Sequence, residues 1–161
     1  MEIANFKKIM IATDGSECSK IATDRGIELA KLSGGTVYAV HVVSSAYLSA
    51  SIDGDSFSTM NVNPYWEQIR EAWITQGQQA VNSVKNLGEM KGINVMPVLL
   101  EGDPANELIK YADKEKMDII IMGTQGKTGL DRLLMGSVAG NLVRHSKIPV
   151  MVVRDSFNSL S

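Results

Sequence analysis

The chain has 161 residues, enough for one domain that buries roughly two-thirds of its unfolded surface. A net charge of −2 argues against sequence-independent binding of nucleic acid. The single cysteine, Cys18, excludes an internal disulfide and a cysteine metal cluster. The amino-terminal segment does not have the pattern of a signal peptide, and no apolar run reaches the length of about 18 residues that a membrane span needs. We therefore expect a soluble cytoplasmic protein with no membrane partner.

Short apolar segments alternate with amphipathic ones along the first part of the chain. Residues 8–13 are apolar and β-branched and end at a turn signal, so they predict a strand. The helix after it is expected to begin with Ser16 as N-cap and to stop at Gly34. Residues 36–43 predict the second strand.

A long helix is predicted after the second strand. Asn63 is its expected N-cap, and Pro64 suits the first helical position, where no amide donor is needed. Its apolar side chains recur at helical spacing and predict one buried face, made of Ile69, Trp73, Ala80, Val84 and Leu87.

The next predicted strand covers residues 93–102, and Pro97 within it indicates an edge position or a bulge. Asp103 and Pro104 repeat the cap-then-proline device and open another helix. Residues 117–123 predict the fourth strand, because they are almost continuously apolar.

The carboxyl-terminal part completes the alternation. Residues 148–154 predict a fifth strand, and the helix before it is indicated by apolar residues three or four apart: Leu130, Leu134, Val138, Leu142 and His145. Apolar strands separated by helices predict the α/β class, as an open five-stranded parallel sheet with helices on both faces and right-handed crossovers. We see no second domain in residues 1–161. Residues 44–62 are long for a connection and serine-rich, which leaves a mobile loop or a binding lid and favours the loop.

Polar and glycine-rich segments follow the first and fourth predicted strands. In open α/β sheets, ligands bind at the carboxyl ends of the strands, near the point where the strand order reverses. Glycine lets a phosphate approach backbone amides, and a helix N-terminus offers unpaired N–H donors. Gly136 and Ser137 stand where the last helix would begin. These features predict a phosphate cradle.

Known phosphate motifs can be tested on the segment 122–137. The P-loop pattern fails because Ile121 stands where its first glycine should be, and the dinucleotide pattern GxGxxG also fails. The pattern present is G-x2-G-x9-G-S, formed by Gly123, Gly126 and the pair at 136–137. Together with "IATDGS" near the start and "GSVAGNLVRHSKIPVMVVR" near the end, it resembles the universal stress protein family, in its ATP-binding branch.

The resemblance implies a Rossmann-like fold of the adenine nucleotide alpha hydrolase type and a role for each matching residue. Asp14 would accept hydrogen bonds from the ribose hydroxyls, and Ala12 and Thr13 would line the adenosine pocket beside it. Val42 would meet the adenine edge through its backbone. Met122 and Gly123 would flank the nucleotide. The residues implied to hold the phosphates, helped by Mg²⁺ or Mn²⁺, are Gly126, Gly136, Ser137 and Val138.

The resemblance further implies a regulatory stress-response protein that ATP switches, at most a slow ATPase, and a homodimer formed through residues 148–154. The apolar last strand carries no charge that would protect an exposed edge, which favours the same pairing. We identify no catalytic residue. Slow phosphoryl hydrolysis needs only a bound metal ion and a positioned water, so a true ATP hydrolase remains an alternative. A flavodoxin-like protein that binds FMN is another, because its first loop would hold phosphate similarly. His41 and His145 have no evident nucleophile or metal partner, and we interpret both as structural.

Overall fold

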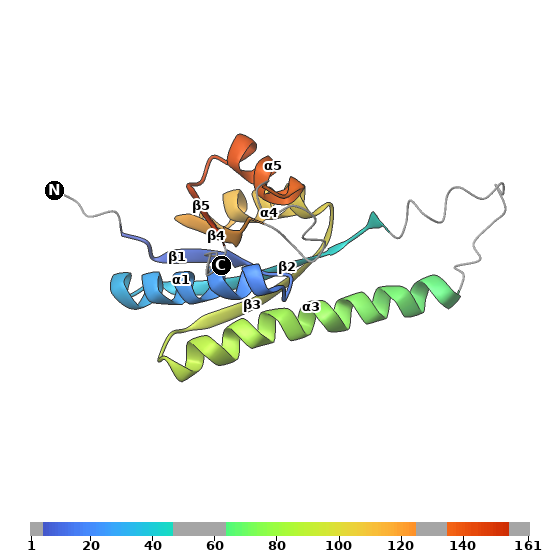
Figure 1. Ribbon diagram of the computed structural model, residues 1–161, viewed down its shortest axis with the longest axis horizontal. Coiled ribbons are helices and arrows are strands. Elements are labelled where there is room, and N and C mark those ends of the chain that lie inside the picture. Colours follow the sequence, from blue (N-terminus) through green and yellow to red (C-terminus); the bar gives the residue numbers. More distant parts are fainter. Residues whose placement is uncertain (1–4, 47–63, 125–134, 155–161) are drawn as a thin grey trace, which may run out of the picture.

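The computed structural model describes residues 5–46, 64–124 and 135–154, and shows one parallel five-stranded sheet at the centre (Figure 1). The order of the strands across the sheet is β3-β2-β1-β4-β5. Their bounds are β1 Lys8–Ala12, β2 Thr36–Ser44, β3 Val95–Gly102, β4 Ile119–Gly123 and β5 Val150–Val153. This arrangement confirms the predicted fold class.

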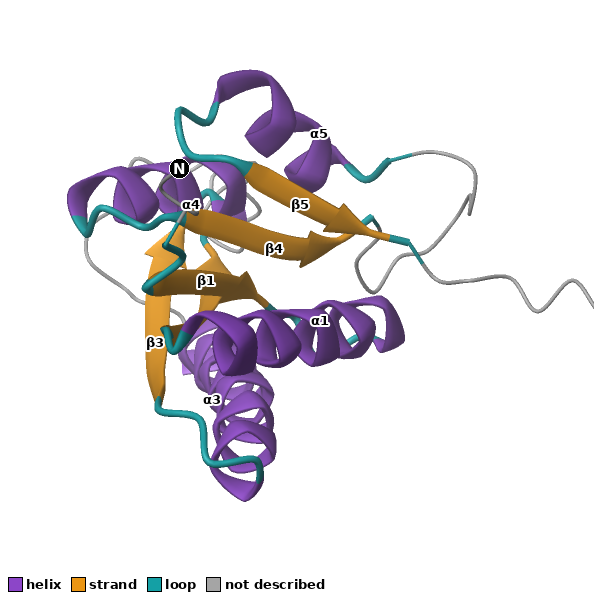
Figure 2. Ribbon diagram, turned by 90° about the vertical axis from the view of Figure 1, so that its left-hand side faces the viewer, coloured by secondary structure: helices purple, strands orange, loops and turns teal. Residues whose placement is uncertain are grey.

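Helices cover both faces of the sheet. α1 and α3 lie on one face and α4 and α5 on the other, as the two perpendicular views show (Figures 1 and 2). The bounds of these helices are α1 Glu17–Ser33, α3 Pro64–Met90, α4 Pro104–Lys114 and α5 Ser137–His145. α1, α3 and α5 each connect neighbouring parallel strands, whereas α4 connects β3 to β4 across β2 and β1. Because helices cover both faces, the strands must be apolar on both sides.

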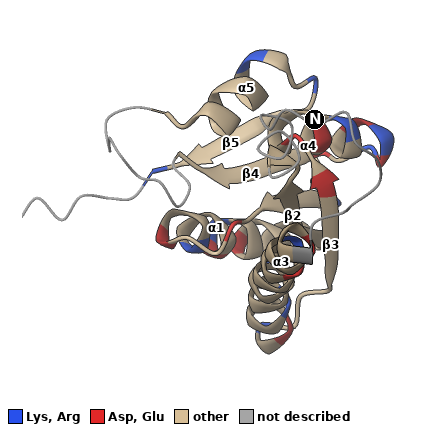
Figure 3. Cartoon of the chain, turned by 90° about the vertical axis from the view of Figure 1, so that its right-hand side faces the viewer, with Lys and Arg blue, Asp and Glu red and all other residues tan. Residues whose placement is uncertain are grey.

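The alternation of side chains along β1 divides the core into two clusters. Ile9 and Ile11 are fully buried against α1, whereas Met10 and Ala12 pack toward α4 and α5. Charged residues lie mainly on the helices (Figure 3), and the charged residues of the five strands are Lys8 and Glu101. Burial of both sheet faces explains why the strand segments read as continuous apolar runs.

The predicted helix caps agree with the structure where it describes them. The Ser16 hydroxyl accepts a hydrogen bond from the Ser19 amide at 3.3 Å, and Gly34 ends α1 with a left-handed φ of 68°. The Asp103 carboxylate accepts from the Asn106 amide at 3.1 Å, so it caps α4. α3 begins at Pro64, while its predicted cap, Asn63, lies outside the described residues.

Two further predictions have different outcomes. Pro97 does lie in an edge strand, β3, where its missing amide donor interrupts no internal ladder. The helical pattern drawn through residues 130–145 is not one continuous helix, because Met135 and Gly136 are non-helical and α5 begins at Ser137. Leu130 and Leu134 lie outside the described residues, as does most of the predicted loop, over 47–62.

Candidate functional site

A pocket of about 260 Å³ opens at the carboxyl ends of β1 and β4. The chain leaves β1 toward β2 and leaves β4 toward β5, so the connections diverge at this point. The β1–β4 pairing ends at Ile11 and Ile121, one residue before the β1–β2 pairing ends. In Figure 2 the arrowheads of β1, β4 and β5 point to the same side of the molecule. The order of the strands therefore creates the crevice.

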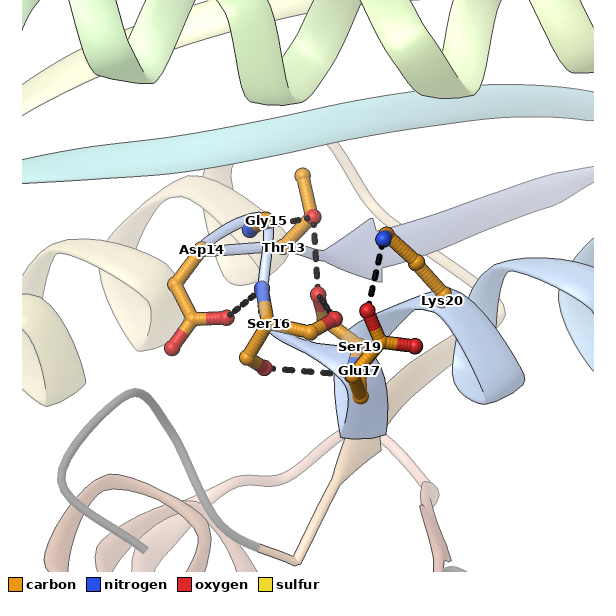
Figure 4. A network of polar contacts seen from close by, with 7 residues as sticks. All are labelled: Thr13, Asp14, Gly15, Ser16, Glu17, Ser19 and Lys20. Atoms are coloured by element: carbon orange, nitrogen blue, oxygen red, sulfur yellow. Dashed lines mark hydrogen bonds and ion pairs between the residues drawn. The ribbon is translucent and has the colours of Figure 1, made fainter.

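The loop between β1 and α1 forms one wall of the pocket (Figure 4). The Asp14 carboxylate accepts a hydrogen bond from the Ser16 amide at 2.9 Å, and the Thr13 hydroxyl accepts one from the Gly15 amide at 3.2 Å. Gly15 has a φ of 78°, a left-handed conformation that favours glycine. The Ser19 hydroxyl lies 3.3 Å from that of Thr13. Local bonds thus hold Asp14 at the pocket rim.

The amino-terminal end of α5 forms the opposite wall. Gly136 is the N-cap residue of this helix, and glycine has no side chain that could cap the first amides. The first backbone bond of the helix runs from the Gly140 amide to the Gly136 carbonyl at 2.9 Å, so the amides of Ser137, Val138 and Ala139 precede this ladder. Amides of this kind, at the positive end of the helix dipole, suit an anion.

Gly123 has a packing role that the sequence interpretation did not foresee. A Cβ atom built at Gly123 would lie 2.7 Å from the Cys18 Sγ and 3.0 Å from the Cys18 carbonyl carbon. Real Cβ atoms essentially never come within 3.0 Å of a heavy atom outside their own residue and its two chain neighbours. The first turn of α1 therefore packs directly against the end of β4, and glycine permits this contact independently of any ligand.

The structure brings nearly all of the predicted site residues to this one pocket. Nine of the ten line it, and the tenth, Gly126, lies outside the described residues. The nine are Ala12, Thr13, Asp14, Val42, Met122, Gly123, Gly136, Ser137 and Val138. Residues that are separated by more than a hundred positions in the sequence thus lie around one pocket. Their role in binding stays a prediction.

Other lining residues were missed by sequence reasoning. Pro104 and Leu108 of α4 and Val40 of β2 add apolar surface, while Ser19 and Thr124 add hydroxyls. The position of α4 after the carboxyl end of β3 was the available signal, because a helix that follows a parallel strand begins at this edge of the sheet. The apolar periodicity of α4 was assigned to the core alone.

Within residues 5–46, 64–124 and 135–154, no group of three or more His, Cys, Asp and Glu side chains is placed to hold a metal ion. Among the same residues, no helix has the length and apolar character needed to cross a membrane. Asp14 is the one carboxylate among the described lining residues of the pocket.

The fold and the pocket define a parallel α/β protein with a pocket at the reversal of strand order. The model of the universal stress protein family matches residues 5–154, and the chain belongs to this family. Universal stress protein MJ0531 of Methanocaldococcus jannaschii is 41% identical over 149 residues, which are 92% of this chain and 82% of that relative.

Solved structures show the same fold. The structure of protein MJ0577 has a TM-score of 0.79 and 29% sequence identity, covering 95% of this chain and 99% of that one. Universal stress protein MJ0577 is also from Methanocaldococcus jannaschii. The universal stress protein from Archaeoglobus fulgidus, solved in complex with dAMP, has a TM-score of 0.65 and 20% identity, covering 93% of this chain and 99% of that one.

Proposed function

We propose that this protein binds ATP in the pocket between β1 and β4 and acts as a nucleotide-dependent regulatory switch in a stress response. The observation that carries the proposal is the arrangement of the two walls. The Asp14 carboxylate stands at one wall, and uncapped helix amides stand at the other. A nucleotide needs both, since its ribose donates hydrogen bonds and its phosphates accept them.

The phosphates are assigned to the α5 wall. Gly136, Ser137 and Val138 present the amides, the Ser137 hydroxyl adds a donor, and Gly126 is included from the family pattern. Mg²⁺ or Mn²⁺ would be held mainly by the phosphates, because the described pocket lining offers one carboxylate. When bound, the metal ion would neutralise phosphate charge, since the described lining residues include no lysine or arginine.

The nucleoside is assigned to the β1 and β2 side of the pocket. Asp14 would accept from the ribose hydroxyls, while Ala12, Thr13 and Met122 supply a mostly apolar surface. Val42 would meet adenine through its peptide group. The volume of about 260 Å³ lies just below the range of small-molecule pockets, roughly 300–1,000 Å³. We therefore assign the pocket to the nucleoside, with the phosphates extending along α5. The dAMP held by the Archaeoglobus fulgidus protein supports this class of ligand.

ATP hydrolysis is the second candidate, because a bound metal ion and a positioned water suffice for slow phosphoryl transfer. A turnover rate well above background that falls on substitution of Asp14 or Ser137 would favour an enzyme. FMN is the third candidate, and the colour of the purified protein distinguishes it. A yellow preparation indicates flavin, and a colourless one with adenine absorbance supports ATP.

We also propose a homodimer formed through the edge of β5. In this strand Val150 and Val152 are half-buried, and Met151 is 40% exposed. Val143 of α5, the helix that precedes β5 in the chain, is 49% exposed. An edge with apolar side chains and no charge tends to pair with another strand, and two-fold pairing is the commonest dimer symmetry.

The proposed ligand can be tested without prior choice of a nucleotide. Purified protein is denatured, and the released small molecules are identified by mass. ATP or ADP at about one per chain supports the proposal. If none is released, titration calorimetry with ATP and Mg²⁺ decides, and the absence of binding heat at millimolar ATP together with no protection of Tm would refute it.

A further inference from the structure

The backbone hydrogen bonds between β1 and β2 follow the regular parallel pattern up to the pocket. The Thr36 amide donates to the Lys7 carbonyl at 2.8 Å, and the Thr13 amide donates to the Val40 carbonyl at 3.0 Å. In this register the even-numbered residues of β2 direct their peptide groups toward β1. A parallel ladder would continue with a bond from the Val42 amide to the Thr13 carbonyl.

A side-chain hydrogen bond replaces this next bond of the ladder. Among the hydrogen bonds between described residues, the Thr13 carbonyl accepts from His41 Nδ1 at 2.8 Å, and no bond joins it to the Val42 amide. A carbonyl can only accept, so Nδ1 carries a hydrogen, as it does in one neutral tautomer and in the imidazolium. Because β1 has ended at Ala12, the Val42 peptide faces the pocket that Val42 lines.

The His41 ring has a space reserved for it under α3. A Cβ atom at Gly77 would lie 2.5 Å from His41 Cδ2 and 2.8 Å from Leu99 Cδ1. Glycine inside a helix is destabilising relative to alanine, yet this position in the middle of α3 holds one. The absence of a side chain at Gly77 gives the imidazole room between the helix and the Thr13 carbonyl.

We propose that His41 is a positioning residue that ends the β1–β2 ladder and keeps the Val42 peptide available to the base of the ligand. The identity of that base rests on the proposed function. The Val42 amide and carbonyl form an adjacent donor and acceptor, which complement the ring nitrogen and the exocyclic amine of adenine. His41 acts through Val42 and need not contact the nucleotide itself.

The first test uses nucleotide-free protein. Hydrogen exchange of the Val42 amide, followed by NMR, is compared in wild type, His41→Leu and His41→Asn. Leucine fills a similar volume but cannot donate, so the Val42 amide should bond to Thr13 and its protection should rise about tenfold, the worth of one hydrogen bond. Asparagine can donate from a similar position and should leave the exchange fast. If His41→Leu does not fold, Gly77→Ala displaces the ring and carries the same expectation.

The second test compares ATP with purine riboside triphosphate, which lacks the exocyclic amine. Wild type and His41→Asn should prefer ATP by about five- to tenfold, and this preference should approach one in His41→Leu because the base contact is lost. A merely structural role would weaken both ligands equally.

The two proposals fail differently. Wild type that binds neither triphosphate refutes the ATP site but leaves the exchange result standing. Val42 exchange that is already slow in wild type, or that does not change in the leucine variant, overturns the role of His41 whether or not ATP binds.

Discussion

Substitution of Gly123 by alanine tests how closely α1 approaches the end of β4. The added methyl group would lie 2.7 Å from Cys18 Sγ, and 3.0 Å from both the Cβ and the carbonyl carbon of Cys18. The sulfur could move by rotation about χ1, but the carbonyl carbon is part of the helix backbone. Relief of the contact therefore requires a shift of the first turn of α1, which carries one wall of the pocket.

The size of the effect follows from two opposing contributions. Overpacking a close contact costs about 1–3 kcal/mol, and alanine recovers about 0.4–1 kcal/mol by restricting the unfolded chain. The midpoints of the two ranges, about 2 and about 0.7 kcal/mol, leave a net loss of about 1.3 kcal/mol for Gly123→Ala. In a chain of this length each kcal/mol lowers Tm by about 2–4 °C, so Tm should fall by about 3–5 °C.

Calorimetry on wild type and two alanine variants measures this effect. Gly140→Ala is the matched control, because its Cβ would lie 3.4 Å from the flexible end of Arg144, in a helix where alanine is preferred. This variant should gain about 0.5–1 kcal/mol, so the two substitutions should shift Tm in opposite directions. A Gly123→Ala variant as stable as Gly140→Ala would contradict the close packing of α1.

Three other substitutions test the proposed ligand and assembly. Asp14→Ala should weaken ATP and ADP by the same factor of about ten, measured by calorimetry, because a ribose contact does not depend on phosphate number; a selective loss of ATP would reassign Asp14 to a metal ion. Gly136→Val should abolish ATP binding, because the added side chain would occupy the space of the phosphate oxygens. The circular dichroism spectrum should not change, since a φ of −60° suits valine. Gly126→Val carries the same expectation, and unchanged affinity for ATP would show that the phosphates bind elsewhere. Val152→Lys should convert a dimer into a monomer in light scattering, and a persistent dimer would exclude this edge.

The sequence predicted the parallel sheet because burial on both faces leaves a direct trace in composition. Strands such as β4 read as unbroken apolar runs, and Ser16 and Asp103 mark helix starts through short-range bonds. The positions of the site residues followed from a simple rule, that the carboxyl ends of parallel strands share one edge. These features depend on local chemistry and on the order of the elements.

The missed features depend on contacts between distant segments. The apolar spacing predicted one helix that runs through Met135 and Gly136, but α5 begins after these residues. Apolar spacing alone does not show where a helix cap interrupts the pattern. His41 was interpreted as structural with no partner in view, since a bond to a backbone carbonyl leaves no complementary side chain in the sequence. Gly77 gave no signal either, because the ring that needs its space comes from β2.

Glycine has two uses around this pocket, and only one of them concerns the ligand. Gly136 leaves the α5 amides uncapped, which bears directly on phosphate binding. The absence of a side chain at Gly123 lets the first turn of α1, which follows the β1–α1 loop, pack against β4. The absence of a side chain at Gly77 leaves room for the His41 ring, which bonds to the Thr13 carbonyl in the same loop. The loop that carries Asp14 is thus fixed by packing at two glycines that need not touch a nucleotide. A loss of affinity after substitution at Gly123 is therefore evidence about the position of this loop. A loss at Gly77 is evidence about His41 and the Val42 peptide, and a loss at Gly136 is evidence about the phosphate cradle.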